Sequence, residues 1–324
     1  MLFSKTLDHE MVDACVAEFA AASGCESGGL AAHCYYESAD FPGQRLVFTL
    51  VGSPLGALSL KVDFAPGQTR LRREFDHLKR LHDALGQDPR NSVVTPVYLS
   101  PGGAFHVTQL AEGKTAKEVV YASSQDAQAA QAFRRGGQWL EALHKSTVPQ
   151  EAPIWLGWMT DTLSRRLEAG DSAVPAARIE AEMQRLKREL APFQGAPHPR
   201  AFSHGDYLGG NLILGRGINI GLDFTESEEK HRVYDVVDFL KMDVMRPCPQ
   251  SVIGPEGLNR SAREMFLRGY RLPLSPDLLT LCLRGRLLID WVAITQDRLE
   301  QSAFQRRKYA AHETRLTAAL ALTG

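Results

Sequence analysis

Cysteine is scarce in this chain of 324 residues, which has only five, at Cys15, Cys25, Cys34, Cys248 and Cys282. No two of them have the C-x-x-C spacing of zinc ribbons and thiol redox sites. Because their number is odd and their spacing irregular, both a disulfide framework and a zinc site are disfavoured. The cysteine content therefore predicts a protein of a reducing cytoplasm.

Long apolar runs are also lacking. Near the amino terminus, the stretch from Met11 to Ala22 is interrupted by Asp13 and Glu18, and its spacing is that of an amphipathic helix. We therefore expect neither a signal peptide nor a membrane span. The sequence shows no internal repeat and no low-complexity tract.

Neither sign of charge is in excess. The chain has 37 Lys and Arg against 38 Asp and Glu, which gives a formal net charge of −1. A balanced chain of this kind has no general attraction for nucleic acid or for an anionic membrane surface. We therefore expect neither as a partner, and nothing in the sequence indicates an oligomeric state.

Apolar side chains, by contrast, are plentiful at 44% of the residues, which is enough for a sizeable core. Strand patterns dominate before residue 108 and helical patterns dominate after it. We predict an α+β fold with a strand-rich amino-terminal lobe, 1–108, and a mainly helical carboxy-terminal lobe, 109–324. Helices are expected over 127–145, 158–169, 176–190, 257–270, 276–296 and 300–320.

The most informative segment reads Ser-His-Gly-Asp-Tyr-Leu-Gly-Gly-Asn over residues 203–211. An H-x-D-x-x-x-x-N loop carries its Asp and its Asn on the two arms of one tight connection. Phosphoryl transfer needs an acceptor hydroxyl to be oriented and magnesium to be held against the nucleotide phosphates. In such a site Asp206 serves the hydroxyl and Asn211 helps to hold the metal.

A second carboxylate follows at the end of a short hairpin. Residues 212–214 form an apolar run, 215–217 read Gly-Arg-Gly and predict a turn, and 218–222 predict a second strand. This strand delivers Asp223 at its end. The hairpin is expected to fold Asp223 back beside Asn211, where both can bind magnesium.

An isolated His-Gly-Asp can also be a turn whose aspartate caps a helix or satisfies backbone donors. The asparagine five residues on, the glycine-bounded hairpin and the second aspartate together favour the kinase-like site. His204 itself is expected to be structural. Its imidazole can hydrogen-bond nearby backbone or Asp235 and so hold the shape of the loop.

A site of this kind also needs an upstream lysine on a strand, paired with a glutamate on the next helix. Residues 45–52 and 57–62 predict two strands joined by a turn. Alternation places Lys61 on a face with small residues, where a flat adenine ring can lie. The alternative is a lysine that stands in solvent on an exposed strand face.

The helix expected over roughly 68–85 supplies the glutamate. Its apolar stripe consists of Leu71, Phe75, Leu78, Leu81 and Leu85. Glu74 falls on this stripe, where a carboxylate is costly unless a cation meets it. We therefore predict a Lys61–Glu74 ion pair. A solvent-exposed Glu74 among charged neighbours is the alternative.

These residues resemble the catalytic core of the aminoglycoside phosphotransferase and choline kinase family, small-molecule kinases with a two-lobed protein-kinase-like fold. The matching segments are His204-Gly205-Asp206, Asn211, Leu222-Asp223-Phe224 and Tyr234 to Leu240. The resemblance implies ATP and Mg2+ as cofactors and a hydroxyl group of a small molecule as acceptor. It also implies that Asp206 is the base, that Asn211 and Asp223 are magnesium ligands, and that Asp235 braces the catalytic loop.

The resemblance further implies a hinge between the lobes. Strands are expected over 93–99 and 104–110, and the latter runs into a polar, glycine-containing connection. Backbone groups near Gln109 to Ala111 are then expected to meet the adenine edge. No turn repeats glycine as a G-x-G-x-x-G loop does, so no turn is assigned to the phosphates.

A small-molecule kinase is favoured over a protein kinase. Gly205 stands where protein kinases have the arginine that reads a phosphorylated activation loop, and Asp235 follows Asp223 by only twelve positions without an A-P-E segment. The acceptor is therefore expected to be compact. Amino alcohols such as choline and ethanolamine, sugars and aminoglycosides all remain open, and the lack of acidic excess slightly favours a metabolic acceptor.

Two acidic segments bear on the acceptor. Glu226, Glu228 and Glu229, with Asp290, Trp291 and Asp297, can make a pocket for an amine by Coulomb attraction or cation–π contact. The alternative, a solvated acidic turn and a core tryptophan with surface carboxylates, is favoured because charged faces of this kind are common.

Two other classes of function are less consistent with the sequence. A nucleotide-binding regulatory or scaffold protein of the same fold need not keep a base, so the intact set of Lys61, Glu74, Asp206, Asn211 and Asp223 argues against it. A metal-dependent hydrolase built on His204, Asp206 and Asp223 lacks a second histidine at ligand spacing.

Overall fold

The computed structural model of the protein describes residues 9–65, 67, 69–123 and 126–322. These residues group into two compact units. The first unit contains the chain up to Gly113 together with Gly215–Ser227, and the second contains Lys114–Leu214 and the chain from Glu228 onward. The segment Gly215–Ser227 thus groups with the amino-terminal part, although a division along the sequence at residue 108 assigns it to the other lobe.

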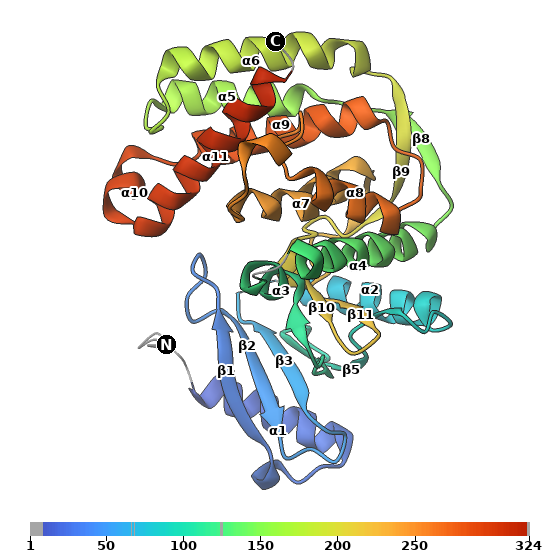
Figure 1. The fold of residues 1–324 in the computed structure, drawn as a ribbon. Helices are drawn as coiled ribbons and strands as arrows, with labels where there is room; N and C mark the ends of the chain where they lie inside the picture. The colour runs from blue at the N-terminus through green and yellow to red at the C-terminus, as the bar shows by residue number, and fades with distance from the viewer. Residues whose placement is uncertain (1–8, 66, 68, 124–125, 323–324) are drawn as a thin grey trace. The chain divides into compact units, whose positions relative to one another are not determined.

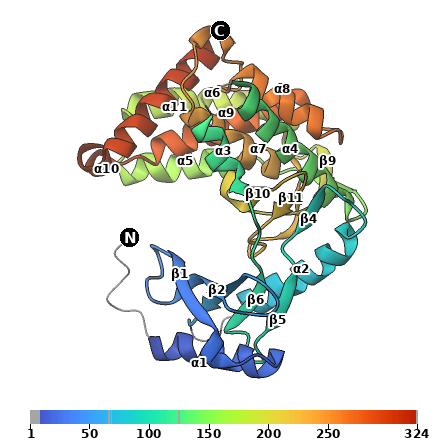
Figure 2. The same ribbon diagram turned by 60° about the horizontal axis from the view of Figure 1, so that its bottom comes forward.

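The first unit is built on a five-stranded antiparallel sheet with strand order β1-β2-β3-β6-β5. The strands are β1 (Ala31–Glu37), β2 (Arg45–Val51), β3 (Leu58–Asp63), β5 (Pro96–Leu99) and β6 (Phe105–Gln109). Helix α1 (His9–Ser23) lies along one face of this sheet in both views (Figures 1 and 2). Its Phe19 packs with Phe48 and Leu60 in a buried core. Since successive strand residues point to opposite faces, the polar positions of β3 lie on the other face.

Helix α2 (Arg70–Leu85) follows β3 and has the expected apolar stripe. The stripe residues Leu71, Phe75, Leu78, Leu81 and Leu85 are all buried. Glu74 is buried with them, at 2% exposure. Gln68, at which the helix was expected to begin, lies outside the described residues.

A parallel strand pair ties the segment Gly215–Ser227 to the first unit. Strand β4 (Asn91–Val93) pairs with β11 (Asn219–Gly221), and Asn219 Nδ2 donates a hydrogen bond of 2.8 Å to Asn91 Oδ1. Val94 N also donates to Gly221 O on β11. At the following residue the partner changes, because Thr95 O accepts from Gln109 N on β6. The single strand expected over 93–99 is therefore divided into β4 and β5, because the chain changes partners between these two residues.

The second unit is mainly helical. Its helices are α3 (Ala116–Ala122), α4 (Asp126–Lys145), α5 (Gly157–Ala169), α6 (Ala176–Leu190), α7 (Val233–Leu240), α8 (Arg260–Gly269), α9 (Pro276–Val292), α10 (Gln296–Gln301) and α11 (Ala303–Ala321). Strands β7 (Lys114–Thr115) and β10 (Leu212–Leu214) form an antiparallel pair, and β8 (Gln150–Pro153), β9 (Pro197–Ser203) and β12 (Glu228–His231) form an antiparallel sheet of order β12-β9-β8. Helices α5 and α6 lie side by side (Figure 1).

The single helix expected over 300–320 is two helices in the structure. Ser302 has an extended backbone, with φ −125° and ψ 118°, and its side chain accepts a hydrogen bond from Gln305 N. It is therefore the N-cap of α11, and it ends α10. Thr295 caps α10 in the same way by accepting from Arg298 N. Helix α9 ends at Val292, before residue 296 to which the helix was expected to run.

Two glycines let helices α4 and α8 approach closely. A Cβ atom built on Gly137 of α4 would lie 2.2 Å from Phe266 O, and one built on Gly269 of α8 would lie 2.1 Å from Arg134 O. No side chain fits between these backbones. The contact holds α4 in place, and α4 carries residues that support the catalytic loop.

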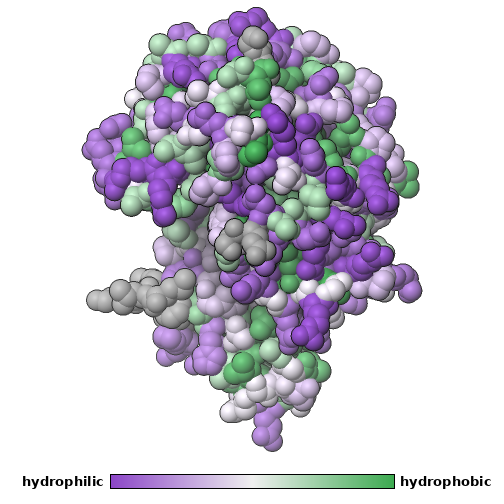
Figure 3. Space-filling model, in the orientation of Figure 1, coloured by the Kyte–Doolittle hydropathy of each residue, from purple (hydrophilic) through white to green (hydrophobic). Residues whose placement is uncertain are grey.

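Among the described residues, no helix combines the length and the apolar character needed to cross a membrane. On the face shown in Figure 3, hydrophilic side chains are interspersed with small hydrophobic patches. Such mixing is ordinary, because apolar atoms contribute more than half of a folded protein's accessible surface.

Substitution Gly137→Ala is expected to lower the free energy of unfolding by about 3 kcal/mol, because the added methyl group collides with the α8 backbone. Urea unfolding followed by circular dichroism measures this change. Gln131→Ala, on the exposed side of the same helix, should change the value by less than about 0.5 kcal/mol. Equal stability of the two variants would contradict the close approach of α4 and α8.

Candidate active site

Lys61 lies on the face of the first unit's sheet opposite helix α1, as the strand alternation predicted. Leu58, Leu60 and Val62 of β3 are buried on the α1 side, whereas Ser59 and Lys61 face the other way and are only partly buried. This arrangement gives Lys61 access to a ligand on that face while its aliphatic stem rests on the sheet.

The predicted Lys61–Glu74 ion pair is present. Lys61 Nζ donates to both carboxylate oxygens of Glu74, at 3.0 and 2.9 Å, and also to Asp223 Oδ1 at 2.8 Å. Burial acts to lower the pKa of Lys61, but the charges of Glu74 and then Asp223 outweigh burial, and the pKa is raised. Lys61 is therefore a firmly cationic group held between two carboxylates.

Asp223 has an unusual backbone conformation. Its φ of 58° lies in the left-handed region, which non-glycine residues seldom adopt. The Thr225 hydroxyl donates to Asp223 Oδ1 at 2.8 Å and accepts from Arg70 Nη2 at 2.9 Å. Arg73 donates to Thr225 O, and Phe224 N donates to Glu74 Oε1. Helix α2 thus holds the segment that presents the Asp223 carboxylate.

Strand register fixes which turn of the first unit lies near Lys61. Lys61 pairs with Val47 and Arg45 pairs with Asp63, so Lys61 is at the end of the sheet where the turn 38–44 enters β2. The turn 52–57 is at the opposite end, because Leu50 pairs with Leu58. Of these two turns, the structure therefore places 38–44 nearer to the lysine.

The expected hinge residues lie at the end of β6. Gln109 pairs with Leu58, and its amide donates to Thr95 O at 2.9 Å. Leu110 N donates to Ala57 O at 3.0 Å. Ala111 follows in the connection to the second unit. The main-chain amides of both Gln109 and Leu110 are therefore engaged within the first unit.

In the second unit, Asp235 on α7 contacts the catalytic loop as expected. His204 N donates to Oδ2 at 2.7 Å and Gly205 N donates to Oδ1 at 3.0 Å. Gly205 has φ 81°, a conformation that favours glycine. His144 Nε2 lies 3.1 Å from Oδ2, and Tyr270 Oη lies 2.8 Å from His144 Nδ1.

Asp235 is 1% exposed, so its charge is stabilised by protein groups and not by bulk water. Burial acts to raise the pKa of its carboxyl group, but the hydrogen bond from His144, the His144 and His204 rings and the backbone donors outweigh burial, and the pKa is lowered. The ionised carboxylate can therefore accept from both loop amides at neutral pH.

His204 is enclosed by aromatic rings. Its imidazole is fully buried, with the Trp139 ring centroid at 6.0 Å and the Tyr207 centroid at 5.6 Å. Tyr207 stacks on Phe239 at 4.7 Å and donates to Gly136 O at 2.8 Å. This packing agrees with a structural role for His204. The hydrogen bond that His204 makes to Asp235 comes from its main-chain amide. The imidazole 3.1 Å from Asp235 Oδ2 belongs to His144.

Asp206 and Asn211 lie together on the partly exposed side of the same loop. Asn211 Nδ2 donates to Asp206 O at 2.8 Å and is 3.4 Å from Asp206 Oδ2. Since the amide nitrogen is directed to Asp206, the carbonyl oxygen Oδ1 is the Asn211 atom suited to a cation. Hard oxygen donors of this kind fit magnesium, which completes its shell with water and phosphate.

Within the described parts of the chain, no group of three or more His, Cys, Asp or Glu side chains is arranged to hold a metal. Each unit contains one candidate oxygen ligand, the Asp223 carboxylate in the first and Asn211 Oδ1 in the second. Magnesium that arrives with nucleotide phosphates is commonly held by only one or two protein ligands.

The sequence-predicted residues thus fall into two groups. Lys61, Glu74 and Asp223 are in contact within the first unit. The catalytic-loop residues and their support, Asp206, Asn211, His204 and Asp235, are in contact within the second.

Several supporting residues were missed by the sequence reasoning. His144 is the penultimate residue of the helix expected over 127–145, Tyr270 follows the last residue of α8, and neither belongs to a motif. His106 on β6 lies 3.3 Å from Glu74 Oε2, and the sequence predicts for it only a place in the strand expected over 104–110. No local signal identifies such residues, because their partners are distant in sequence.

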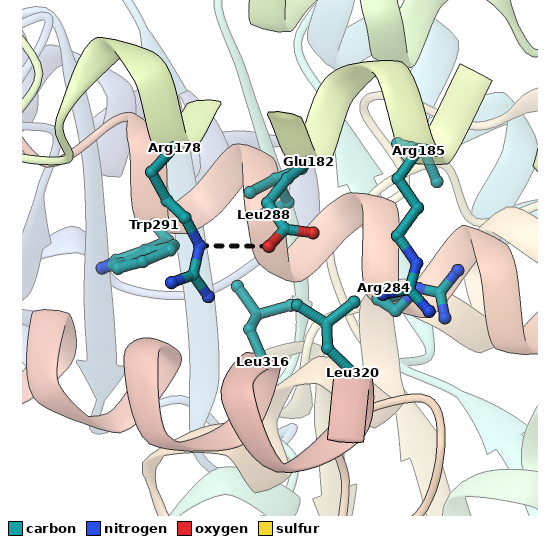
Figure 4. A pocket seen from close by; sticks show the side chains of 9 residues that line it. Arg178, Glu182, Arg185, Arg284, Leu288, Trp291, Leu316 and Leu320 are labelled. Atoms are coloured by element: carbon teal, nitrogen blue, oxygen red, sulfur yellow. Dashed lines mark hydrogen bonds and ion pairs between the residues drawn. The ribbon is translucent and has the colours of Figure 1, made fainter. Parts of the chain in front are cut away.

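The surroundings of Trp291 within the second unit bear on the expected amine pocket. Trp291 is 2% exposed and lies beside a small pocket whose charged lining is Arg178, Arg185, Arg284 and Glu182 (Figure 4). Arg178 pairs with Glu182 at 3.0 Å.

The carboxylates themselves have ordinary surroundings. Glu226, Glu228, Glu229 and Asp297 are exposed, and Asp290 pairs with Arg286 at 3.5 Å. The described side chains therefore agree with a core tryptophan and surface carboxylates, the alternative that the sequence favoured.

The fold and the two groups of residues define the class of small-molecule phosphotransferases. The sequence profile of the phosphotransferase enzyme family, APH, matches residues 44–280, so the chain belongs to this family. The predicted family, the α+β protein-kinase-like fold and the enzyme class of small-molecule kinases are thereby confirmed. A search of the curated protein sequences finds no match.

Solved structures of the same fold include three that illustrate the range of the family. A choline/ethanolamine kinase family protein from Mesorhizobium loti has TM-score 0.57 and 16% identity, covering 96% of this chain and 98% of that chain. The amicoumacin kinase hAmiN, in complex with AMP-PNP, Ca2+ and Ami, has TM-score 0.57 and 17% identity, covering 98% and 94%. A glucosamine kinase in complex with glucosamine, ADP and inorganic phosphate has TM-score 0.58 and 15% identity, covering 99% and 86%.

Substitution Asp235→Asn is expected to lower the free energy of unfolding by about 3 kcal/mol at pH 7, because the loop amides lose a buried charged acceptor. The pKa of Asp235 is lowered on folding, so its contribution is present above the unfolded-state pKa and is lost as pH falls through the folded one. The gap between wild type and variant should therefore narrow below about pH 4. Urea titrations from pH 7 downward measure it.

The control is Asp161→Asn, an exposed aspartate on α5, which should cost less than about 0.5 kcal/mol. A difference between wild type and Asp235→Asn that stayed constant with pH would show that the charge of Asp235 is not what stabilises the loop.

Proposed function

We propose that the protein is an ATP- and Mg2+-dependent phosphotransferase that moves the γ-phosphate to a hydroxyl group of a small molecule. The observation that carries the proposal is Lys61, which is held within 3.0 Å of both Glu74 and Asp223. A lysine whose charge is retained by two carboxylates on a sheet face is suited to grip nucleotide phosphates.

Asp206 is the proposed base. An aspartate in the H-x-D-x-x-x-x-N position accepts the proton of the acceptor hydroxyl as that oxygen bonds to phosphorus. The two loop amides bound to Asp235 and the amide of Asn211 fix the main chain around Asp206. A base held in one place loses little entropy when the acceptor is aligned.

Asn211 and Asp223 are the proposed ligands of magnesium, through Asn211 Oδ1 and the Asp223 carboxylate. When bound, the ion neutralises charge on the nucleotide phosphates. The Thr225 hydroxyl orients the Asp223 carboxylate by donating to Oδ1. Hydrogen bonds of this kind set the direction of a metal ligand.

The nucleotide is proposed to lie at the part of the first unit's sheet where Lys61 leaves it, on the face opposite helix α1. Its adenine edge is proposed to meet backbone groups between Gln109 and Ala111. Its phosphates are proposed to reach Lys61, which lies three residues along β3 from Leu58, the strand partner of Gln109. The turn 38–44 is proposed to cover the phosphates, because the register places it at the Lys61 end of the sheet.

The acceptor is proposed to be an amino alcohol, a sugar or an aminoglycoside. A solved kinase of the same fold holds glucosamine, which is a hydroxylated amine, and another is an amicoumacin kinase. The interval between Asp223 and Asp235 is too short for an ordered peptide-docking loop, which supports a compact acceptor over a protein.

Substitution Asp206→Asn is expected to reduce acceptor-stimulated ATP consumption by at least about 100-fold while leaving nucleotide affinity nearly unchanged, because only the base is removed. Magnesium-dependent ATP consumption is measured against a panel of amino alcohols, sugars and aminoglycosides. Full turnover by Asp206→Asn on an active acceptor would remove Asp206 from the role of base. Tight nucleotide binding without stimulation by any acceptor would favour the regulatory alternative.

Substitution Asp223→Asn is expected to weaken binding of Mg2+ with the non-hydrolysable analogue AMP-PNP by about tenfold or more, because a ligand charge is lost. Calorimetric titration with Mg2+ and with EDTA measures the difference. In EDTA the variant should bind nearly as wild type. Unchanged affinity in Mg2+ would exclude Asp223 as a metal ligand, and Asp161→Asn serves as the matched control.

A further inference from the structure

Strand β6 carries a buried imidazole for which the proposed phosphotransfer has no use. His106 pairs with Lys61 in the β3–β6 register, so both side chains leave the sheet on the same face. Its neighbours Phe105 and Val107 point to the opposite face and pack in the α1 core. His106 is 3% exposed, whereas an apolar residue would fill such a position without a polar atom to satisfy.

The imidazole completes a symmetric set of contacts on Glu74. Oε1 accepts from Lys61 at 3.0 Å and from Phe224 N at 3.2 Å. Oε2 accepts from Lys61 at 2.9 Å and lies 3.3 Å from His106 Nε2. Each oxygen therefore has one contact with Lys61 and one with a second group, and His106 is the second group at Oε2.

The two ring nitrogens of His106 differ in their surroundings. Nδ1 of His106 is buried and has no hydrogen-bond partner in the described part of the chain. An unpaired buried polar atom is destabilising, so its presence must be offset by the contact that Nε2 makes. Burial acts to raise the pKa of Glu74, but Lys61 and then the His106 hydrogen bond outweigh burial, and the pKa is lowered.

Lys61 Nζ forms ion pairs with both Glu74 Oε2, at 2.9 Å, and Asp223 Oδ1, at 2.8 Å. A divalent cation bound to Asp223 would compete with Lys61 for that carboxylate and would repel the ammonium group. Glu74 is then the remaining anchor that keeps Lys61 at the phosphates. The orientation of its carboxylate matters most in that state.

We infer that His106 is a positioning residue for nucleotide binding: it fixes Oε2 of Glu74, and through Glu74 it keeps Lys61 in place when Asp223 binds magnesium. This inference rests on the function proposed above. It makes a specific demand, namely that loss of the His106 contact weakens nucleotide binding more in the presence of magnesium than in its absence.

The experiment compares two amide variants of the whole chain. In His106→Gln the amide nitrogen stands near the place of Nε2 and can still donate to Glu74, whereas in His106→Asn the side chain is too short to reach. The probe is AMP-PNP, titrated calorimetrically with excess Mg2+ and again in EDTA. Ser100→Ala is the structural control, because it removes a hydrogen bond of 3.2 Å to Phe105 N beside His106 without touching Glu74.

We expect His106→Asn to weaken AMP-PNP affinity about tenfold in Mg2+, the size of effect typical of one hydrogen bond to a charged group, and less than about threefold in EDTA. His106→Gln and Ser100→Ala should stay within about threefold of wild type in both. In a Glu74→Gln background, His106→Asn should have no further effect, because the residue acts through Glu74.

Equal weakening by His106→Asn with and without Mg2+, or additive effects in the Glu74→Gln background, would overturn the inference. So would wild-type affinity of His106→Asn in Mg2+. Lys61→Ala separates these outcomes from failure of the proposed function. If Lys61→Ala binds as tightly as wild type, the nucleotide site is wrong; if it loses binding while His106→Asn does not, only the role of His106 is wrong.

Discussion

The first unit depends on the buried carboxylate of Glu74. A carboxylate removed from water is stable only when donors surround it, and here the donors come from β3, from β6 and from the segment after Asp223. Because these elements lie far apart in the sequence, the requirement of one side chain draws together the sheet, helix α2 and the residue proposed to bind metal. The position of Lys61 follows from this arrangement.

Asp235 is the corresponding buried carboxylate of the second unit, and it too needs hydrogen-bond donors in place of water. Both of its oxygens receive donors, but the donors are main-chain amides of the catalytic loop, and the result is a fixed loop instead of a fixed lysine. In both cases an imidazole is the additional partner, His106 for Glu74 and His144 for Asp235. One unit therefore uses a buried charge to place a cation, and the other uses it to shape the backbone beside the proposed base.

Sequence predicted well those features whose physical requirement is local. The Lys61–Glu74 pair could be foreseen because Glu74 falls on an apolar stripe, and a charge there demands a partner. The catalytic loop could be foreseen because its spacing is confined to a few residues. The roles of His106 and His144 could not be foreseen, because the carboxylate partner is 32 residues away in sequence for His106 and 91 residues away for His144. Strands β8 and β12 were missed because they are short and largely exposed, so they lack the apolar alternation that marks a strand.

The grouping of Gly215–Ser227 with the first unit has a consequence for dissecting the protein genetically. The polypeptide passes from one unit to the other three times, after Gly113, after Leu214 and after Ser227. A fragment that stops at Gly113 would lack β11 and leave the buried Asn91 amide without Asn219. Neither unit is thus encoded by one continuous stretch of gene, and each can be isolated only by rejoining or permuting the chain.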